Sequence, residues 1–173
     1  MKAWIGLGSN LDQPAERLIQ ALHAFQRLPG VTLTGHSRLY ASAPVGPRDQ
    51  PDFVNAAASL DTHLSPLALL HSLQALELAA GRVRRRHWGE RTLDLDILLI
   101  DNRTLSLPSL QVPHPHLTER AFVLIPLREI APGICLPDGT PLDSFLPAVQ
   151  DQAIHPLAEL NAHDLVENPQ RTD

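Results

Sequence analysis

Hydrophobic residues recur along this chain with two different periods, and the change of period marks out its secondary structure. Short apolar or alternating runs predict strands at residues 3–8, 31–40, 53–62 and 91–101. Apolar spacings of three and four residues predict two helices between them. The first begins at Pro14 and ends at Pro29–Gly30, and the second is opened by Ser65–Pro66 and closed by Gly81.

The order β-α-β-β-α-β predicts an α+β, ferredoxin-like sandwich with a C-terminal extension. In this fold class we expect an antiparallel sheet with its helices on one face. Gly35 is expected to form a bulge, and residues 41–52, rich in proline, glycine and aspartate, form a loop of functional length. Two short strands are expected around residues 104–112, while the apolar stretch 121–130 fits either a helix or a strand.

Composition narrows the class of protein. The chain has 173 residues and a net charge of −5, which suits one compact domain and does not favour general binding to nucleic acid. Cys135 is the only cysteine, so an intramolecular disulfide and a cysteine-based zinc cluster are excluded. No apolar run approaches membrane-spanning length, and the N-terminus resembles no signal peptide. We expect a cytoplasmic monomer with one domain at 1–150, a loosely held polar tail at 151–173, and neither a membrane nor a nucleic-acid partner.

The strand RTLDLDILLID, residues 91–101, carries two aspartates inside an apolar run. Asp94 and Asp96 lie two residues apart, so they project to the same face with Cα atoms about 6.5–7 Å apart. The opposite face is expected to carry Leu93, Leu95, Ile97 and Leu99. Unpaired buried carboxylates are costly, and all-oxygen ligands suit Mg²⁺, so the pair predicts a magnesium site. The alternative is a strand end whose aspartates are simply solvated.

A basic segment precedes this strand. Five arginines fall within residues 82–91, namely Arg82, Arg84, Arg85, Arg86 and Arg91, with Trp88 among them. Guanidinium groups match phosphate oxygens, although a solvated charged loop is the simpler reading of such a run taken alone. Arginines next to paired carboxylates indicate a nucleoside-triphosphate site, and the absence of G-x-x-x-x-G-K-[ST] excludes a P-loop.

Two further groups could line such a site. Phe53 and Asn55 share one strand face, where a ring and an amide can stack on and read a flat heterocycle, with Phe122 as a second ring. Core packing is the alternative for both rings. His114 and Arg120 fit phosphate better than zinc, because no third zinc ligand accompanies His114 and His116.

Four segments together resemble the 6-hydroxymethyl-7,8-dihydropterin pyrophosphokinases of folate biosynthesis, over residue 1 to about 150. They are GLGSNL, YASAPVGPRDQPDFVNAA, HWGERTLDLDILL and VPHPHLTERAFVLIPL. The resemblance implies ATP- and magnesium-dependent transfer of pyrophosphate, in which the pterin hydroxymethyl oxygen attacks the β-phosphorus of ATP and AMP leaves. An RNA-binding module and a non-catalytic nucleotide sensor on the same fold remain alternatives, although no strand carries the aromatic RNA-binding signature.

By matching positions, the resemblance also implies roles for individual residues. Asp94 and Asp96 would hold two magnesium ions, and with Arg82 and Arg91 they would form the catalytic group. The ATP side would consist of Gln74, Glu77, Arg84, Trp88, Arg91, His114 and Arg120. The pterin pocket would consist of Ser42, Val45, Phe53, Asn55, Asp94 and Phe122. The sequence departs from the family pattern where Ser42 replaces a common threonine, Ala43 a common proline, His87 an arginine and Glu90 a proline.

Overall fold

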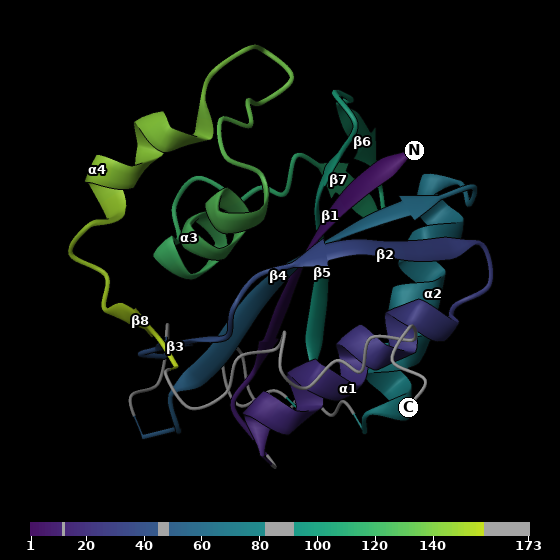
Figure 1. The fold of residues 1–173 in the computed structure, drawn as a ribbon. Coiled ribbons are helices and arrows are strands. Elements are labelled where there is room, and N and C mark those ends of the chain that lie inside the picture. Colours follow the sequence, from purple (N-terminus) through teal and green to yellow (C-terminus); the bar gives the residue numbers. More distant parts are fainter. Residues whose placement is uncertain (12, 45–48, 82–91, 158–173) are drawn as a thin grey trace, which may run out of the picture.

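The computed structural model describes residues 1–11, 13–44, 49–81 and 92–157, which form an antiparallel sheet between two layers of helices (Figure 1). The strands are β1 (Lys2–Ser9), β2 (Val31–His36), β3 (Tyr40–Ser42), β4 (Phe53–Thr62), β5 (Asp94–Ile100), β6 (Leu105–Leu107), β7 (Leu110–Val112) and β8 (Ile154–Pro156). The helices are α1 (Pro14–Arg27), α2 (Pro66–Ala79), α3 (Ala121–Ile130), the 3₁₀ turn η1 (Leu142–Phe145) and α4 (Leu146–Val149).

The main sheet has the order β5-β1-β4-β3-β8, and β2 pairs with β4 beside β3. The elements β1-α1-β2-β4-α2-β5 thus reproduce the β-α-β-β-α-β order, with all pairings antiparallel. The predicted α+β ferredoxin-like fold is confirmed. The strands β6 and β7 form a separate small sheet, as expected for 104–112.

The local signals at the helix ends are also confirmed. Pro14 occupies the first turn of α1, and the Ser65 hydroxyl accepts a hydrogen bond from the Ala68 amide at the start of α2. Gly81 follows α2 with a φ of 77°, a left-handed conformation that glycine adopts without strain. Residues 121–130, which fitted either element, form α3.

One predicted strand, 31–40, is wrong as a single element. The ladder with β4 shifts register between Leu33 and Gly35, which confirms the bulge, and β2 ends at His36. At Ser37 the backbone amide donates to the Ala57 carbonyl, while the Ser37 hydroxyl accepts from the Ala57 amide. A side-chain oxygen therefore replaces a backbone carbonyl, and the chain can turn before pairing resumes at Tyr40 in β3.

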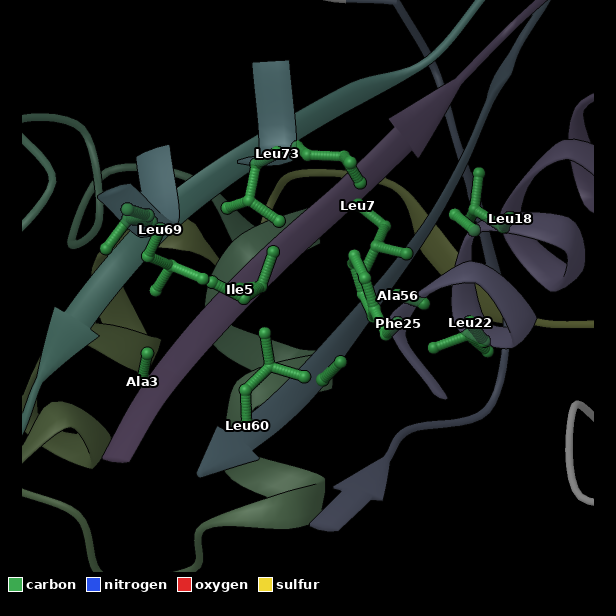
Figure 2. Packing of buried hydrophobic residues seen from close by; sticks show 14 of the residues in the cluster. Ala3, Ile5, Leu7, Leu18, Leu22, Phe25, Ala56, Leu60, Leu69 and Leu73 are labelled. Carbon is green, nitrogen blue, oxygen red and sulfur yellow. The ribbon is translucent and has the colours of Figure 1, made fainter. Parts of the chain in front are cut away.

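Two hydrophobic clusters cover opposite faces of the sheet. Figure 2 shows the first, in which Ile5 and Leu7 of β1 pack against Leu69 of α2 and Phe25 of α1. In the second, Ala121, Leu124 and Leu127 of α3 pack with Ala57, Leu98, Leu99 and Leu117. The expectation of helices on one face is confirmed for α1 and α2, which both pack in the first cluster. The helix α3 lies on the second face, because β4 and β5 present apolar side chains there as well (Figure 1).

The alternation predicted for β5 holds only as far as Ile97. Ile5 pairs with Ile97 and Trp4 pairs with Leu99, so Leu98 is an extra residue in a bulge. Beyond it the faces exchange: Ile100 joins the first cluster and Leu99 joins the second. The predicted face of Leu99 is thus wrong, whereas Leu93, Leu95 and Ile97 lie in the expected cluster.

The start of the expected tail belongs to the sheet. Ile154–Pro156 forms β8, which pairs with β3, and the Leu157 amide donates to the Leu39 carbonyl. The expectation of a loosely held segment is wrong for residues 154–157, because β3 has an edge that this strand satisfies. Residues 158–173 lie outside the described part. No described helix is both long enough and apolar enough to cross a membrane.

Candidate functional site

The two aspartates of β5 lie on the face of the sheet that α3 partly covers. Antiparallel pairing aligns Asp94 with Gly8, and Gly8 with Asn55 of β4. The adjacent row aligns Asp96 with Gly6. Asp94 is partly exposed and Asp96 is exposed, so both carboxylates reach solvent from one face, as their spacing predicted.

Glycines form the floor between the carboxylates and β4. A Cβ added at Gly8 would approach the Asn55 Oδ1 to 3.3 Å, and one added at Gly6 would approach the Leu98 Cδ2 to 3.3 Å. The absence of side chains at these positions keeps open the surface between Asp94 and Asn55. The place of Gly6 and Gly8 between the aspartates and β4 depends on the register of three strands that are distant in sequence.

A buried hydrogen bond fixes the amide at the other end of this row. Asn55 is 3% exposed and Ser42 is 5% exposed, and the Asn55 Nδ2 donates to the Ser42 Oγ over 2.7 Å. Phe53 is paired in register with Ser42 and is half-buried. The structure thus brings together three of the predicted pterin-binding residues at the junction of β3 and β4.

A pocket of about 380 Å³ opens beside Ser42. One wall consists of Ser42, Ala43 and Pro44, and the other of Glu119, Arg120, Ala121 and Phe122, with His116, Gln152 and Ala153 completing the lining. The Arg120 guanidinium carbon lies 5.6 Å from the centre of the Phe122 ring. The pocket therefore unites Ser42 with Arg120 and Phe122. Phe53, Asn55 and Asp94 are not among its lining residues, so stacking between Phe53 and Phe122 stays a prediction.

Helix α3, which carries Phe122, is attached to β3 by a polar cluster. The Glu129 carboxylate accepts hydrogen bonds from the Arg38 backbone amide, the Arg38 Nε and the Tyr40 hydroxyl, at 2.5, 2.6 and 3.0 Å. Tyr40 lies two residues before Ser42 on β3. The hydrogen bonds of Glu129, near the C-terminal end of α3, thus hold this helix against the strand that leads to Ser42.

His114 is held next to β5 as a neutral ring. Its backbone amide donates to the Leu98 carbonyl over 2.9 Å, and its Nδ1 accepts from the His116 amide over 3.1 Å. Burial, with the positive charges of Arg120 and His116 nearby, lowers the pKa of His114 to about 4. At neutral pH the ring is therefore uncharged and able to donate through Nε2.

Gln74 and Glu77, the two α2 residues that the resemblance assigns to the ATP side, differ in their exposure to solvent. Gln74 is exposed, but Glu77 is 4% exposed, and its Oε2 accepts from the Leu95 amide over 3.0 Å. Because β5 is an edge strand, the outer edge of β5 has no neighbouring strand within the part of the chain that the structure describes. The Glu77 carboxylate supplies a hydrogen-bond acceptor there, at Leu95, the residue between the two aspartates. The burial of Glu77 could have been predicted from its spacing, since Glu77 continues the buried i, i+4 series of Leu69 and Leu73.

Five of the predicted site residues lie outside the described part of the chain: Val45, Arg82, Arg84, Trp88 and Arg91. Gln152 and Ala153 also line the pocket, and the sequence did not single them out, because they lie at the start of the polar segment 151–173 that was expected to be a loosely held tail.

Comparison with known proteins gives one consistent family. Residues 4–132 match the model of the 7,8-dihydro-6-hydroxymethylpterin-pyrophosphokinase family. The chain is 53% identical over 156 residues to a 2-amino-4-hydroxy-6-hydroxymethyldihydropteridine pyrophosphokinase of Pseudomonas aeruginosa, covering 90% of this chain and 96% of that protein. It is 47% identical to the enzyme of the same name from Haemophilus influenzae, covering 92% and 98%.

Solved structures agree on the fold. An HPPK-DHPS in complex with substrates aligns with a TM-score of 0.68 at 14% identity, over 87% of this chain and 44% of that one. A triple mutant of Plasmodium falciparum HPPK-DHPS with pteroate aligns with a TM-score of 0.66 at 15% identity, over the same shares. This chain thus spans less than half of each of those proteins. By its sequence over residues 4–132 and its similarity to the bacterial enzymes, the chain belongs to the 7,8-dihydro-6-hydroxymethylpterin-pyrophosphokinase family.

Proposed function

We propose that this chain transfers pyrophosphate from ATP to the hydroxymethyl group of 6-hydroxymethyl-7,8-dihydropterin, with release of AMP, in folate biosynthesis. The observation that carries the proposal is the row formed by Asp94, Gly8 and Asn55, which sets a solvent-facing carboxylate opposite a fixed buried amide. Membership of the family supports the reaction class, and the names of the bacterial relatives support the substrate.

The carboxylate pair fits magnesium. Within the described ranges no three His, Cys, Asp or Glu side chains gather to hold a metal. Mg²⁺ does not need such a group, because it keeps several waters and is usually bound by one or two carboxylates together with substrate phosphates. We propose that Asp94 and Asp96 hold two such ions, which would neutralise charge on the ATP phosphates when bound.

The other residues would bind and orient the two substrates. We propose that Asn55 and Ser42 recognise the edge of the pterin and that Phe122 stacks on its ring, with Phe53 on the opposite face. The neutral His114 and the charged Arg120 would donate to ATP phosphates. The proposed reaction needs no nucleophile from the protein, because positioning and charge stabilisation supply most of the catalysis in phosphoryl-type transfer.

The residues outside the described part enter only through the resemblance. Arg82 and Arg91 would stabilise charge during transfer, and Arg84 and Trp88 would contact ATP. Val45 would contact the pterin. We also propose that Gln74 contacts ATP from its exposed position on α2, whereas the buried Glu77 would act on the ATP side through β5.

We further propose a cytoplasmic monomer. The single cysteine, Cys135, suits a reducing compartment. Light scattering of the purified protein tests the oligomeric state, and a dimer mass at micromolar concentration would contradict it.

The function is tested by measuring AMP released from ATP in the presence of the hydroxymethyl pterin and Mg²⁺. Asp94→Ala and Asp96→Ala should each nearly abolish turnover, and the double variant should be little worse, because the two carboxylates act as a unit. Asp61→Ala is the matched control, since Asp61 is an exposed aspartate on β4. Near-normal activity of both single variants would contradict the metal assignment, and ATP binding without AMP release in the wild type would favour a nucleotide sensor.

A further inference from the structure

The segment after α4 touches both walls of the pocket beside Ser42. We infer that Gln152 is a positioning residue, which holds Arg120 and Phe122 in place for substrate binding; this inference rests on the proposed function of the site. Gln152 lies beyond residues 4–132, the part of the chain that matches the family model.

The Gln152 amide bonds the backbone on both sides of Arg120. Its Oε1 accepts from the Ala121 amide over 2.8 Å, and its Nε2 donates to the Glu119 carbonyl over 2.8 Å. The Gln152 backbone amide donates to the Val149 carbonyl over 3.0 Å, which turns the chain toward α3 directly after α4. One side chain thus fixes the two peptide groups that flank Arg120.

The start of α3 requires such a partner. The first amides of a helix have no acceptor within the helix, and a Ser, Thr, Asp or Asn side chain usually supplies one. Here the position before the helix is Arg120, with φ −127° and ψ 118°, and its side chain makes no capping hydrogen bond. Gln152 supplies the acceptor for Ala121 from 31 residues away. The direction in which Arg120 and Phe122 leave the backbone therefore depends on this contact.

The same segment reaches the opposite wall. Ile154 follows Gln152 by two residues and pairs with Ser42 in the ladder between β8 and β3. Residues 152–154 thus join the wall that carries Ser42 to the wall that carries Arg120 and Phe122, and Gln152 and Ala153 line the 380 Å³ pocket between them. Both the carbonyl and the amino group of the Gln152 amide are bonded to backbone, so we assign it a positioning role rather than a contact with substrate.

The experiment compares Gln152→Ala and Gln152→Glu with Gln150→Ala, an exposed glutamine on the same segment. Loss of one partly buried and one exposed hydrogen bond should raise the KM for the pterin roughly three- to tenfold in Gln152→Ala, with a smaller change in kcat. Gln152→Glu keeps an acceptor for Ala121 but loses the donor to Glu119, so its KM should lie between those of wild type and Gln152→Ala. Gln150→Ala should match the wild type.

Two measurements separate positioning from general stability. By NMR, hydrogen exchange of the Ala121 amide should accelerate in Gln152→Ala and stay slow in Gln152→Glu and Gln150→Ala. In a Phe122→Ala background, Gln152→Ala should add little further loss of pterin affinity, because its effect passes through that ring. Unchanged Ala121 exchange, a KM equal to that of Gln150→Ala, or fully additive losses would each overturn the inference.

Failure of the proposed function would look different. In that case the wild type would release no AMP with the pterin, while Ala121 exchange would still respond to Gln152→Ala. If Gln152→Ala proves unfolded by circular dichroism, Gln152→Glu decides the question through its pterin KM.

Discussion

Acidification should destabilise this protein through His114. The Nδ1 of His114 accepts a hydrogen bond from the His116 amide. Protonation of Nδ1 removes this hydrogen bond and adds a positive charge beside Arg120. The folded pKa, about 4, lies below the ordinary 6.5. With the pKa lowered on folding, the folded state resists protonation and the unfolded chain takes up the proton first. The stability contributed by the neutral ring is complete above about pH 6.5 and is lost as pH falls toward 4.

The size of the effect follows from the two pKa values. At about pH 5 an unfolded histidine with pKa 6.5 gains about 2 kcal/mol from protonation, while a folded group with pKa about 4 gains almost nothing. The ring is only partly buried, and solvent screens part of its interactions. We therefore expect His114 to account for about 1 kcal/mol of lost unfolding free energy between about pH 7.5 and about pH 5.

Urea unfolding at these two pH values tests the prediction. His114→Gln keeps an acceptor for the His116 amide without a titrating group, so its loss of stability should be smaller than that of the wild type by about 1 kcal/mol. His71→Gln, at an exposed position on α2, should lose as much as the wild type. The reasoning is refuted if wild type and His114→Gln lose equal stability, or if NMR shows that His114 titrates near 6.5.

Three substitutions test the packing and the pterin pocket. Phe122→Ala should weaken pterin binding more than ATP binding, with a stacking part of about 0.5–1.5 kcal/mol, and equal losses in calorimetry would count against a stacking role. Ser42→Ala should lower the unfolding free energy by about 1–3 kcal/mol, because the buried Asn55 amide loses its acceptor; Ser42→Thr should restore it, and an unchanged urea midpoint for Ser42→Ala would refute this. Leu69→Ala should cost about 2–5 kcal/mol in the same assay, since Leu69 lies on the buried face of α2 and is fully buried, and a loss below about 1 kcal/mol would show that this contact matters little.

The local sequence determined the identity of most elements and the place of the carboxylates. Pro14, Ser65 and Gly81 act at single helix ends, where a ring, a hydroxyl or a missing Cβ has its effect within a few residues. The period of two placed Asp94 and Asp96 on one face, because side-chain alternation is a property of the extended backbone itself. The order of these elements was enough to predict the ferredoxin-like fold.

The tertiary structure decided which neighbours each segment meets. Leu98 bulges out of β5 and exchanges the faces of the residues after it, and the Ser37 hydroxyl ends β2 by bonding Ala57. Glu77 is buried because β5 needs a partner on its outer edge, and Gln152 caps a helix that begins 31 residues earlier. Each of these outcomes depends on a hydrogen bond between groups far apart in sequence. A periodic pattern records how a residue relates to its own segment, and only the folded chain determines which distant donor or acceptor it has to satisfy.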